Sequence, residues 1–303
     1  MSGMYVDIHS YGGYVFYPWG YRDAATPDDK ALQALGRKVQ HFNGYRLWAG
    51  SQPHFVYASS GDSADYMYAV LGVAALGLEI GDSFQQECAS FEGAVLPKNL
   101  PALMYLAKLA RRPFREVKGP DVFDLEASYG RGEIRVTARA SDSEMVSGFA
   151  TGSQKIKRVQ VYLDVHPDDE EADGRSWMML PTDAKGNTRS NDTSRPIVCS
   201  TFKNKKKCRR TGGGGVCKWI SRKSRCRRRK VSLPSNFESG GGRVRFSIDA
   251  SAIVPGRHVL YAQATDERGY TGPVSSVFVE VLRRQREPSQ RGSTAPNIEN
   301  GSN

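Results

Sequence analysis

From residue 132 onward, apolar and polar residues alternate with a period of two in five short runs separated by turn residues. Such alternation is typical of a strand that has one face in a core and the other in solvent. Five runs of this kind predict an antiparallel β-sandwich of the immunoglobulin-like type over residues 132–283. The apolar positions are Ile134, Val136 and Ala138; Val159, Val161, Leu163 and Val165; Val244, Phe246 and Ile248; Leu260, Ala262 and Ala264; and Val277, Val279 and Val281.

Residues 1–114 have a different pattern, in which short apolar runs alternate with helical periodicity. We expect strands at 5–10, 14–17, 55–57 and 74–80, and helices at 27–42, 98–111 and after the SSGDSAD loop. Alternating strands and helices predict an α/β fold with a mixed, mostly parallel sheet. In the helix at 27–42, we expect Leu32, Leu35 and Val39 to face inward and Thr26 or Asp28 to cap the N-terminus. In the helix after the SSGDSAD loop, we expect Tyr66, Val70 and Leu71 to face inward, with Asp62 or Ser63 as the cap. In the helix at 98–111, the expected inward residues are Leu100, Leu103, Leu106, Ala107 and Ala110.

The remaining segments complete the predicted organisation of the chain. Residues 115–131 are polar and contain Gly119 and Pro120, so we interpret them as a linker. The alternation stops between Asp183 and Gly242, which places a cysteine-rich basic insertion at 196–230 within the sandwich. Residues 284–303 have almost no large apolar groups, and we expect a disordered tail.

Charge and cysteine are concentrated in that insertion. The net charge of the chain is +11, but residues 199–230 hold fourteen Lys and Arg and no acid, so the remainder carries −3. Cysteines at 199, 208, 217 and 226 are nine residues apart, and this spacing favours two disulfides of undetermined pairing. A zinc site is the alternative, although the gaps are long and the segment lacks His. The positive charge is suited to contacts with an anionic polymer through residues 199–230.

The chemistry is indicated by the segment YVDIHSYGGYVFYPWG, where His9 follows a short apolar strand. Four short segments together resemble the C-terminal half of the catalytic domain of zinc carboxypeptidases. These segments are His9-Ser10-Tyr11, Tyr17-Pro18-Trp19-Gly20, Tyr57 to Asp65 and Leu78-Glu79-Ile80. The resemblance covers roughly residues 4–112. It implies hydrolysis of C-terminal residues from peptides and proteins, with Zn²⁺ as cofactor.

The resemblance also implies roles for six residues. His9 would be a zinc ligand, and Glu79 the general base that moves a proton from the attacking water to the leaving amine. Tyr57 would cover the substrate, and Tyr11 would line a substrate subsite. Asp62 and Ala64 would shape the pocket for the departing side chain: Ala64 leaves its floor uncharged, and Asp62 attracts a basic group.

The sequence departs from the family pattern in its metal ligands. The other two ligands come from a His-x-x-Glu motif, and none of the five His in this chain is followed by Glu at that spacing. The Arg groups that hold the substrate carboxylate are also missing. We therefore expect little or no peptidase activity from this polypeptide, which is interpreted either as a truncated enzyme or as an inactive derivative.

The cellular context follows from the resemblance and the cysteines, which favour an extracellular, secreted protein. The N-terminus lacks the basic start and apolar core of a signal peptide, and no apolar run approaches the roughly 20 residues of a membrane span. An alternative function is a non-catalytic secreted protein that binds anionic polymers or surfaces through the insertion. The oligomeric state is not indicated by the sequence.

Overall fold

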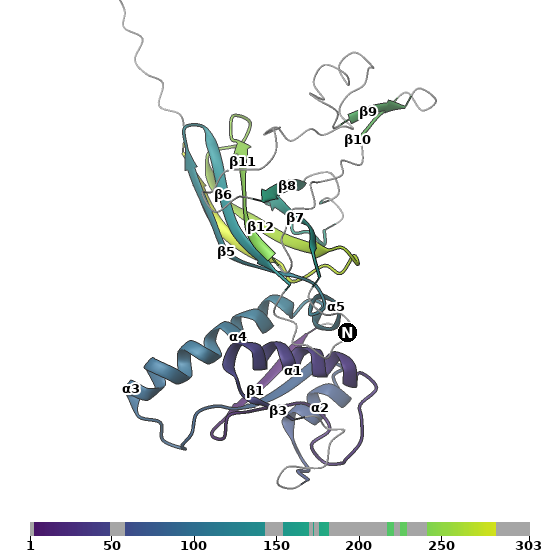
Figure 1. The fold of residues 1–303 in the computed structure, drawn as a ribbon, viewed down its shortest axis with the longest axis vertical. Coiled ribbons are helices and arrows are strands. Elements are labelled where there is room, and N and C mark those ends of the chain that lie inside the picture. The colour runs from purple at the N-terminus through teal and green to yellow at the C-terminus, as the bar shows by residue number, and fades with distance from the viewer. Residues whose placement is uncertain are drawn as a thin grey trace, which may run out of the picture.

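The computed structural model describes residues 3–48, 58–142, 154–169, 172, 176–181, 217–220, 225–228 and 241–282. Within these ranges, a helix-rich region (residues 3–117) is followed by a β-rich region (residues 121–282), as Figure 1 shows. The mixture of α/β structure with antiparallel sheet agrees with the predicted fold class. The immunoglobulin-like type, the domain boundaries and the tail stay predictions.

The helix-rich region is built on a four-stranded sheet with the order β1-β4-β2-β3. β1 pairs with β4 in parallel, β2 pairs with β3 in parallel, and β2 pairs with β4 in antiparallel orientation, so the sheet is mixed. β3 was not predicted, and the predicted strand at 55–57 lies outside the described residues. The strands are β1 (Met4–His9), β2 (Tyr14–Phe16), β3 (Arg46–Trp48) and β4 (Ala74–Glu79).

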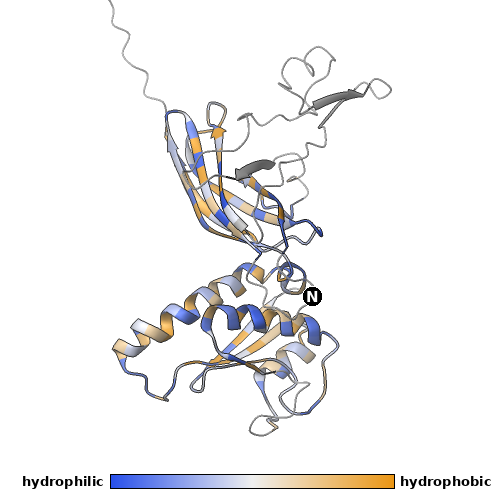
Figure 2. Cartoon of the chain, viewed as in Figure 1, coloured by the Kyte–Doolittle hydropathy of each residue, from blue (hydrophilic) through white to orange (hydrophobic). Residues whose placement is uncertain are grey.

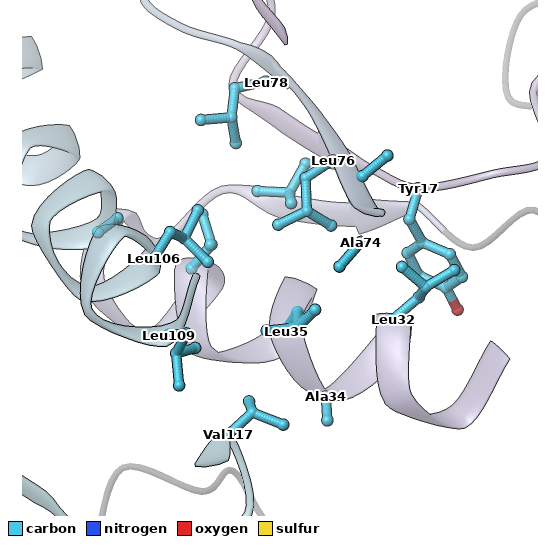
Figure 3. Close-up of a cluster of buried hydrophobic side chains, with 14 of the residues drawn as sticks. Tyr17, Leu32, Ala34, Leu35, Ala74, Leu76, Leu78, Leu106, Leu109 and Val117 are labelled. Atoms are coloured by element: carbon cyan, nitrogen blue, oxygen red, sulfur yellow. The ribbon is translucent and has the colours of Figure 1, made fainter. Parts of the chain in front are cut away.

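Helices α1 (Asp29–Asn43) and α4 (Leu96–Leu109) pack against each other and against this sheet. Leu32, Leu35 and Val39 of α1 are buried, as the sequence predicted. They contact fully buried leucines of β4 and α4 in one apolar core, part of which Figure 3 shows. α1 begins after Asp28, whose side chain makes no capping bond, and ends at Gly44 in the left-handed conformation.

One predicted helix face was wrong, and a second was only partly right. In α2 (Ser63–Ala69) and the residues after it, Tyr66, Val70 and Leu71 are exposed, while Ala64, Asp65 and Tyr68 are buried. In α4, Leu106 is buried and Leu103 packs against the core as predicted, whereas Leu100 and Ala107 are exposed. The full buried set of α4 is Asn99, Ala102, Tyr105, Leu106 and Leu109. The buried faces differ from the prediction because two polar side chains, Asp65 and Asn99, are held inside by hydrogen bonds to distant residues. Apolar periodicity does not reveal such bonds.

The β-rich region contains a seven-stranded antiparallel sheet with the order β13-β12-β7-β8-β11-β6-β5. Each of the five alternating runs forms a strand, and their apolar positions make one core, except Val165, which lies after β7 and packs with Tyr162 and Ala172. The alternation of hydropathy along these strands is visible in Figure 2. The strands are β5 (Asp121–Gly130), β6 (Glu133–Ser141), β7 (Ile156–Leu163), β8 (Ser176–Pro181), β11 (Gly241–Asp249), β12 (Gly256–Asp266) and β13 (Ser275–Val281).

Residues 115–131 are not a plain linker, because most of them form β5. Asp124 has a positive φ of 50°, and the pairing of β5 with β6 shifts between Phe123 and Glu126. This bulge breaks the alternation that marks the other strands. The helix α5 (Pro113–Glu116) joins α4 to β5.

Short elements complete the described chain: α3 (Cys88–Ser90), the π-helical turn η1 (Phe91–Val95), and the hairpin of β9 (Cys217–Ile220) and β10 (Arg225–Arg228). Cys88 is a free, exposed thiol. In the hairpin, Cys226 lies opposite Trp219 rather than opposite Cys217. Cys199 and Cys208 lie outside the described residues, and the disulfides stay a prediction. None of the helices described has the length and apolar character needed to cross a bilayer.

Candidate active site

The register of β1 on β4 decides which side chains meet. Asp7 lies opposite Gly77, and His9 lies opposite Glu79. Because side chains alternate along a strand, these four residues share one face of the sheet. Leu76 and Leu78 point to the other face, where they belong to the apolar core with α1 and α4. One face therefore carries the packing, and the other is available for a site.

A cavity of about 480 Å³ opens on that second face, next to the carboxyl ends of β1 and β4. Asp7, His9, Gly77 and Glu79 all line it. A crevice outside the carboxyl ends of strands is the usual position for a ligand in an α/β sheet. Aromatic side chains make up much of the remaining wall, namely Tyr11, Tyr14, Phe16, Tyr17, Trp19 and Trp48.

His9 is oriented by two neighbours. Its Nε2 lies 3.0 Å from Oδ1 of Asp7, and the Ser63 hydroxyl of α2 donates a hydrogen bond to the other carboxylate oxygen of Asp7. The hydrogen bond from Ser63 holds the pKa of Asp7 below its ordinary value, and the bond to Asp7 raises the pKa of His9. With Nε2 bonded to Asp7, Nδ1 is the ring nitrogen left to face a ligand.

Glu79 ends β4 in a partly desolvated position. Burial raises the pKa of its carboxyl, and His9 opposes this shift only in part. Its Oε2 is buried and has no hydrogen-bond partner. The turn after β1 fixes the backbone here, because Gly13 N–H donates to the Glu79 carbonyl over 2.8 Å. A carboxylate with a raised pKa, facing a cavity, is suited to accept a proton near neutral pH.

The α2 end of the cavity is held by two aspartates. Asp62 caps α2 by accepting a hydrogen bond of 2.8 Å from Ala64 N–H. Asp65 accepts hydrogen bonds from Gly20 N–H at 3.0 Å and from Tyr21 N–H at 3.3 Å. Burial raises the pKa of Asp65. Asp65 thus ties the turn after β2 to α2, which fixes the wall of the cavity.

Five of the six residues suggested by the sequence line this one cavity: His9, Tyr11, Asp62, Ala64 and Glu79. Tyr57 lies outside the described residues. The roles assigned to all six stay predictions.

Several lining residues were not identified from the sequence. Trp48 comes from β3, a strand whose three residues gave too short a pattern to recognise. Trp19 belongs to the segment Tyr17-Pro18-Trp19-Gly20, but the sequence did not suggest a role for it. Phe84 is not itself part of the described lining, but it lies after β4 and its ring contacts that of the lining residue Tyr11 edge-on, with 4.8 Å between centroids. Phe84 is 78% exposed, so this aromatic pair is open to solvent.

The donor set can be compared with what zinc requires. A catalytic zinc site uses three protein ligands and leaves a further position open. His9 provides a suitable imidazole. However, the described ranges contain no group of three His, Cys, Asp or Glu side chains arranged to hold a metal ion. The described residues alone do not fit a complete catalytic zinc site.

Residues 2–99 match the family model for zinc carboxypeptidase. The matched span is about a third of the chain and contains every lining residue of the cavity. That family consists of zinc-dependent hydrolases, and residues 2–99 are similar to it. The match does not extend to the β-rich region.

The solved structures that show some similarity to the chain include the following two. A DUF3823 family protein from Bacteroides ovatus has 9% identity and a TM-score of 0.23, and the similarity covers 54% of this chain and 55% of that protein. Astrotactin-2, a vertebrate-specific and perforin-like membrane protein, has 11% identity and a TM-score of 0.21, with coverage of 66% and 33%. TM-scores this low carry no argument about fold or function.

Proposed function

We propose that the helix-rich region binds the C-terminal residue of a peptide and that its chemistry is that of a zinc-dependent metallocarboxypeptidase. The observation that carries this proposal is the pairing of His9 with Glu79 at the carboxyl ends of two parallel strands, beside a cavity inside the matched span. In this account His9 is a zinc ligand. Glu79 takes a proton from the attacking water and delivers it to the departing amine.

The lining of the cavity supports a preference among C-terminal residues. Four acids line it, Asp7, Asp62, Asp65 and Glu79, and the part of its wall that the structure describes contains no Lys or Arg. Ala64 adds a small apolar surface to the α2 wall. We therefore expect basic and apolar side chains to bind better than acidic ones, with Tyr11 and Phe84 contacting the preceding part of the peptide.

Hydrolysis needs more than these residues supply. One imidazole cannot hold a catalytic zinc ion, and the sequence contains no His-x-x-Glu motif. The expectation for the 303-residue chain alone is thus peptide binding with little or no turnover. This holds whether the chain is a truncated enzyme or an inactive derivative.

Fluorescence titration tests the binding step, because Trp19 and Trp48 line the cavity. The probes are benzoyl-Gly-Lys, benzoyl-Gly-Phe and benzoyl-Gly-Glu, and we expect saturable quenching by the first two. Ala64→Phe places a bulky ring in the α2 wall and should abolish it. Ala69→Phe is the matched control, since Ala69 is exposed on the same helix. Failure of both the Lys and Phe probes to bind would refute a substrate pocket.

A hydrolysis assay with the same probes tests the second step. The purified chain with added Zn²⁺ should release no amino acid above background, and metal analysis should find no stoichiometric zinc. Turnover that Glu79→Gln removes would show that the chain completes its site in another way. It would overturn the expected inactivity while supporting the role of Glu79.

A second candidate function rests on the insertion. Fourteen positive charges lie within residues 199–230, and in the described hairpin Lys218 lies directly opposite Arg227. A segment with this much positive charge and no acid is suited to salt-sensitive contacts with an anion. We therefore propose that this module contacts an anionic polymer such as a sulfated polysaccharide.

A heparin column tests this second function. The triple variant Lys218→Gln, Arg225→Gln and Arg227→Gln should elute at lower salt than the unmodified chain. The matched control carries Lys30→Gln, Lys98→Gln and Lys157→Gln, which removes three exposed charges elsewhere and should elute close to the unmodified chain. Equal shifts for both triple variants would mean that the overall charge, not the module, binds heparin.

A further inference from the structure

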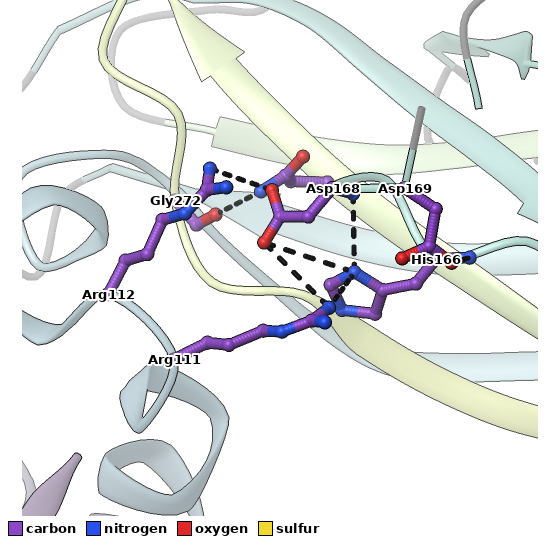
Figure 4. Close-up of polar contacts among 7 residues, drawn as sticks. Arg111, Arg112, His166, Asp168, Asp169 and Gly272 are labelled. Atoms are coloured by element: carbon purple, nitrogen blue, oxygen red, sulfur yellow. Dashed lines mark hydrogen bonds and ion pairs between the residues drawn. The ribbon is translucent and has the colours of Figure 1, made fainter. Parts of the chain in front are cut away.

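The helix-rich and β-rich regions meet at a cluster of charged side chains that the peptide pocket does not use. Arg111 and Arg112 follow α4, and His166 and Asp168 lie on the loop after β7. Figure 4 shows the two arginines reaching across to this loop. Nη1 of Arg112 lies 2.8 Å from Oδ1 of Asp168, and Nη1 of Arg111 lies 2.6 Å from Nδ1 of His166.

The protonation state of His166 follows from its partners. A guanidinium only donates hydrogen bonds, so Nδ1 of His166 must accept the bond from Arg111. The same Nδ1 also accepts from the backbone N–H of Asp168 over 3.2 Å. A ring nitrogen that accepts two bonds carries no proton. The contact therefore requires neutral imidazole with its proton on Nε2.

Charged and titratable groups surround this imidazole from every neighbouring element. Arg111 and Arg112 approach from the end of α4, and Asp168 and Asp169 belong to its own loop. The Tyr261 ring of β12 packs edge-on at 5.3 Å between centroids. On α5, Glu116 is buried near Asp168, and Arg115 acts on Glu116. Burial, followed by Arg111, lowers the pKa of His166.

We propose that His166 is a proton-operated latch between the two regions, closed while its imidazole is neutral and loosened when it gains a proton. A proton on Nδ1 would point at the N–H groups of Arg111 and Asp168. It would also add a third positive charge beside Arg111 and Arg112. The contact between the α4 end and the loop after β7 would then lose its acceptor and become repulsive.

The direction of the pH dependence follows from linkage. The folded protein holds its proton on His166 less tightly than the unfolded chain, whose His has a pKa near 6.5. The latch is therefore fully closed above about pH 6.5 and weakens as the pH falls below it. Glu116 acts in the opposite direction, because its raised pKa makes the folded state gain protons on acidification. Variants of His166 separate the two effects.

Two measurements on the full chain test the latch. Long-range ¹H–¹⁵N correlation spectra report the tautomer of each His ring, and the signal lost in His166→Gln identifies His166. We expect an Nε2–H ring that titrates below pH 6.5. Hydrogen exchange at pH 7.5 and 5.5, corrected for intrinsic rates, reports opening at residues 109–118 and 164–169. The rate should rise up to tenfold for each pH unit between the folded pKa of His166 and 6.5.

The variants give distinct expectations. His166→Gln keeps an acceptor that cannot titrate, so its exchange should not accelerate at pH 5.5. Arg111→Gln removes the guanidinium that donates to His166, so hydrogen exchange in this variant should be fast at both pH values. His41→Gln changes an exposed His on α1 and should behave like the unmodified chain. A proton on Nδ1 of His166 at pH 7.5, or equal acceleration in the unmodified chain and His166→Gln, would overturn the latch.

Discussion

Strands β4 and β6 differ in how their side chains are buried. All of β4 is buried except Glu79 at its end, because helices cover one face, and α2 and side chains that line the cavity, such as Phe16, cover the other. In β6, buried and exposed residues alternate over most of its length, because one face packs in the core and the other meets solvent. Burial on both faces, as in β4, is typical of strands in an α/β sheet, and burial on one face, as in β6, is typical of an antiparallel sheet.

This difference explains where chemistry can arise. In the helix-rich region, the second face of the sheet is enclosed enough to desolvate Glu79 and to orient His9 through Asp7. In the β-rich region, the outward positions of β6, such as Arg135 and Arg139, lie in water. There a carboxylate or imidazole would keep its ordinary properties. Enclosure of both faces, rather than strand content, creates the site.

The largest expected effect is on the core of β4. Leu76→Ala removes a fully buried side chain between the sheet and its helices and should lower the free energy of unfolding by about 2–5 kcal/mol. Urea denaturation followed by circular dichroism measures this loss. Leu282→Ala, at an exposed leucine of the β-rich region, is the control and should change stability by less than about 0.5 kcal/mol. Similar values for the two variants would contradict the contrast in burial.

The next effect lies between the two regions, at Glu116. Burial, with the Asp168 carboxylate, raises the pKa of this carboxyl to about 7. The folded state therefore loses stability as the pH rises from about 4.5 to 7, by at most about 3 kcal/mol. Glu116→Gln removes this dependence, so its stability relative to the unmodified chain should increase over that range. Parallel pH profiles of unfolding free energy for the two proteins would exclude a raised pKa.

A third effect concerns close packing on the cavity side of β4. A Cβ atom at Gly77 would lie 2.3 Å from the Phe16 ring, so Gly77→Ala should cost about 1–3 kcal/mol by overpacking. It should also weaken quenching by benzoyl-Gly-Lys, because Phe16 lines the cavity. Gly93→Ala is the matched control, since nothing lies within 4 Å of its added Cβ. An unchanged melting temperature for Gly77→Ala would mean that Phe16 moves freely.

The smallest effect tests the alternation in β6 directly. Arg135→Ala, on the exposed face, should change the free energy of unfolding by less than about 0.5 kcal/mol. Val136→Ala, one residue later and fully buried, should cost more than about 1 kcal/mol. Both values come from the same denaturation experiment. A larger cost for Arg135 than for Val136 would reverse the assigned faces.

Sequence patterns predicted the helix α1 and the strands whose apolar residues alternate without interruption, because an element that buries one face has apolar residues at regular intervals. They missed β5, where a bulge at Asp124 shifts the pairing, and β3, which has only three residues. They also missed β8, whose consecutive apolar residues SWMMLP do not alternate with polar ones. They also gave the wrong inward face for α2 and a face for α4 of which only Leu103 and Leu106 lie against the core. Asp65 and Asn99 are buried because of partners at Gly20, Asn43 and Tyr45, and no local pattern contains those partners.

For the site, the sequence alone determined the types of the reactive groups and their positions at the ends of apolar strands. Only the tertiary structure decided that they meet. A shift of β1 by one residue along β4 would send Asp7 and His9 to the helix-packed face, away from Glu79. The contact of Arg111 with His166, 55 residues apart, is likewise fixed by how the two regions dock. Register and docking depend on long-range packing, and a sequence read locally does not contain them.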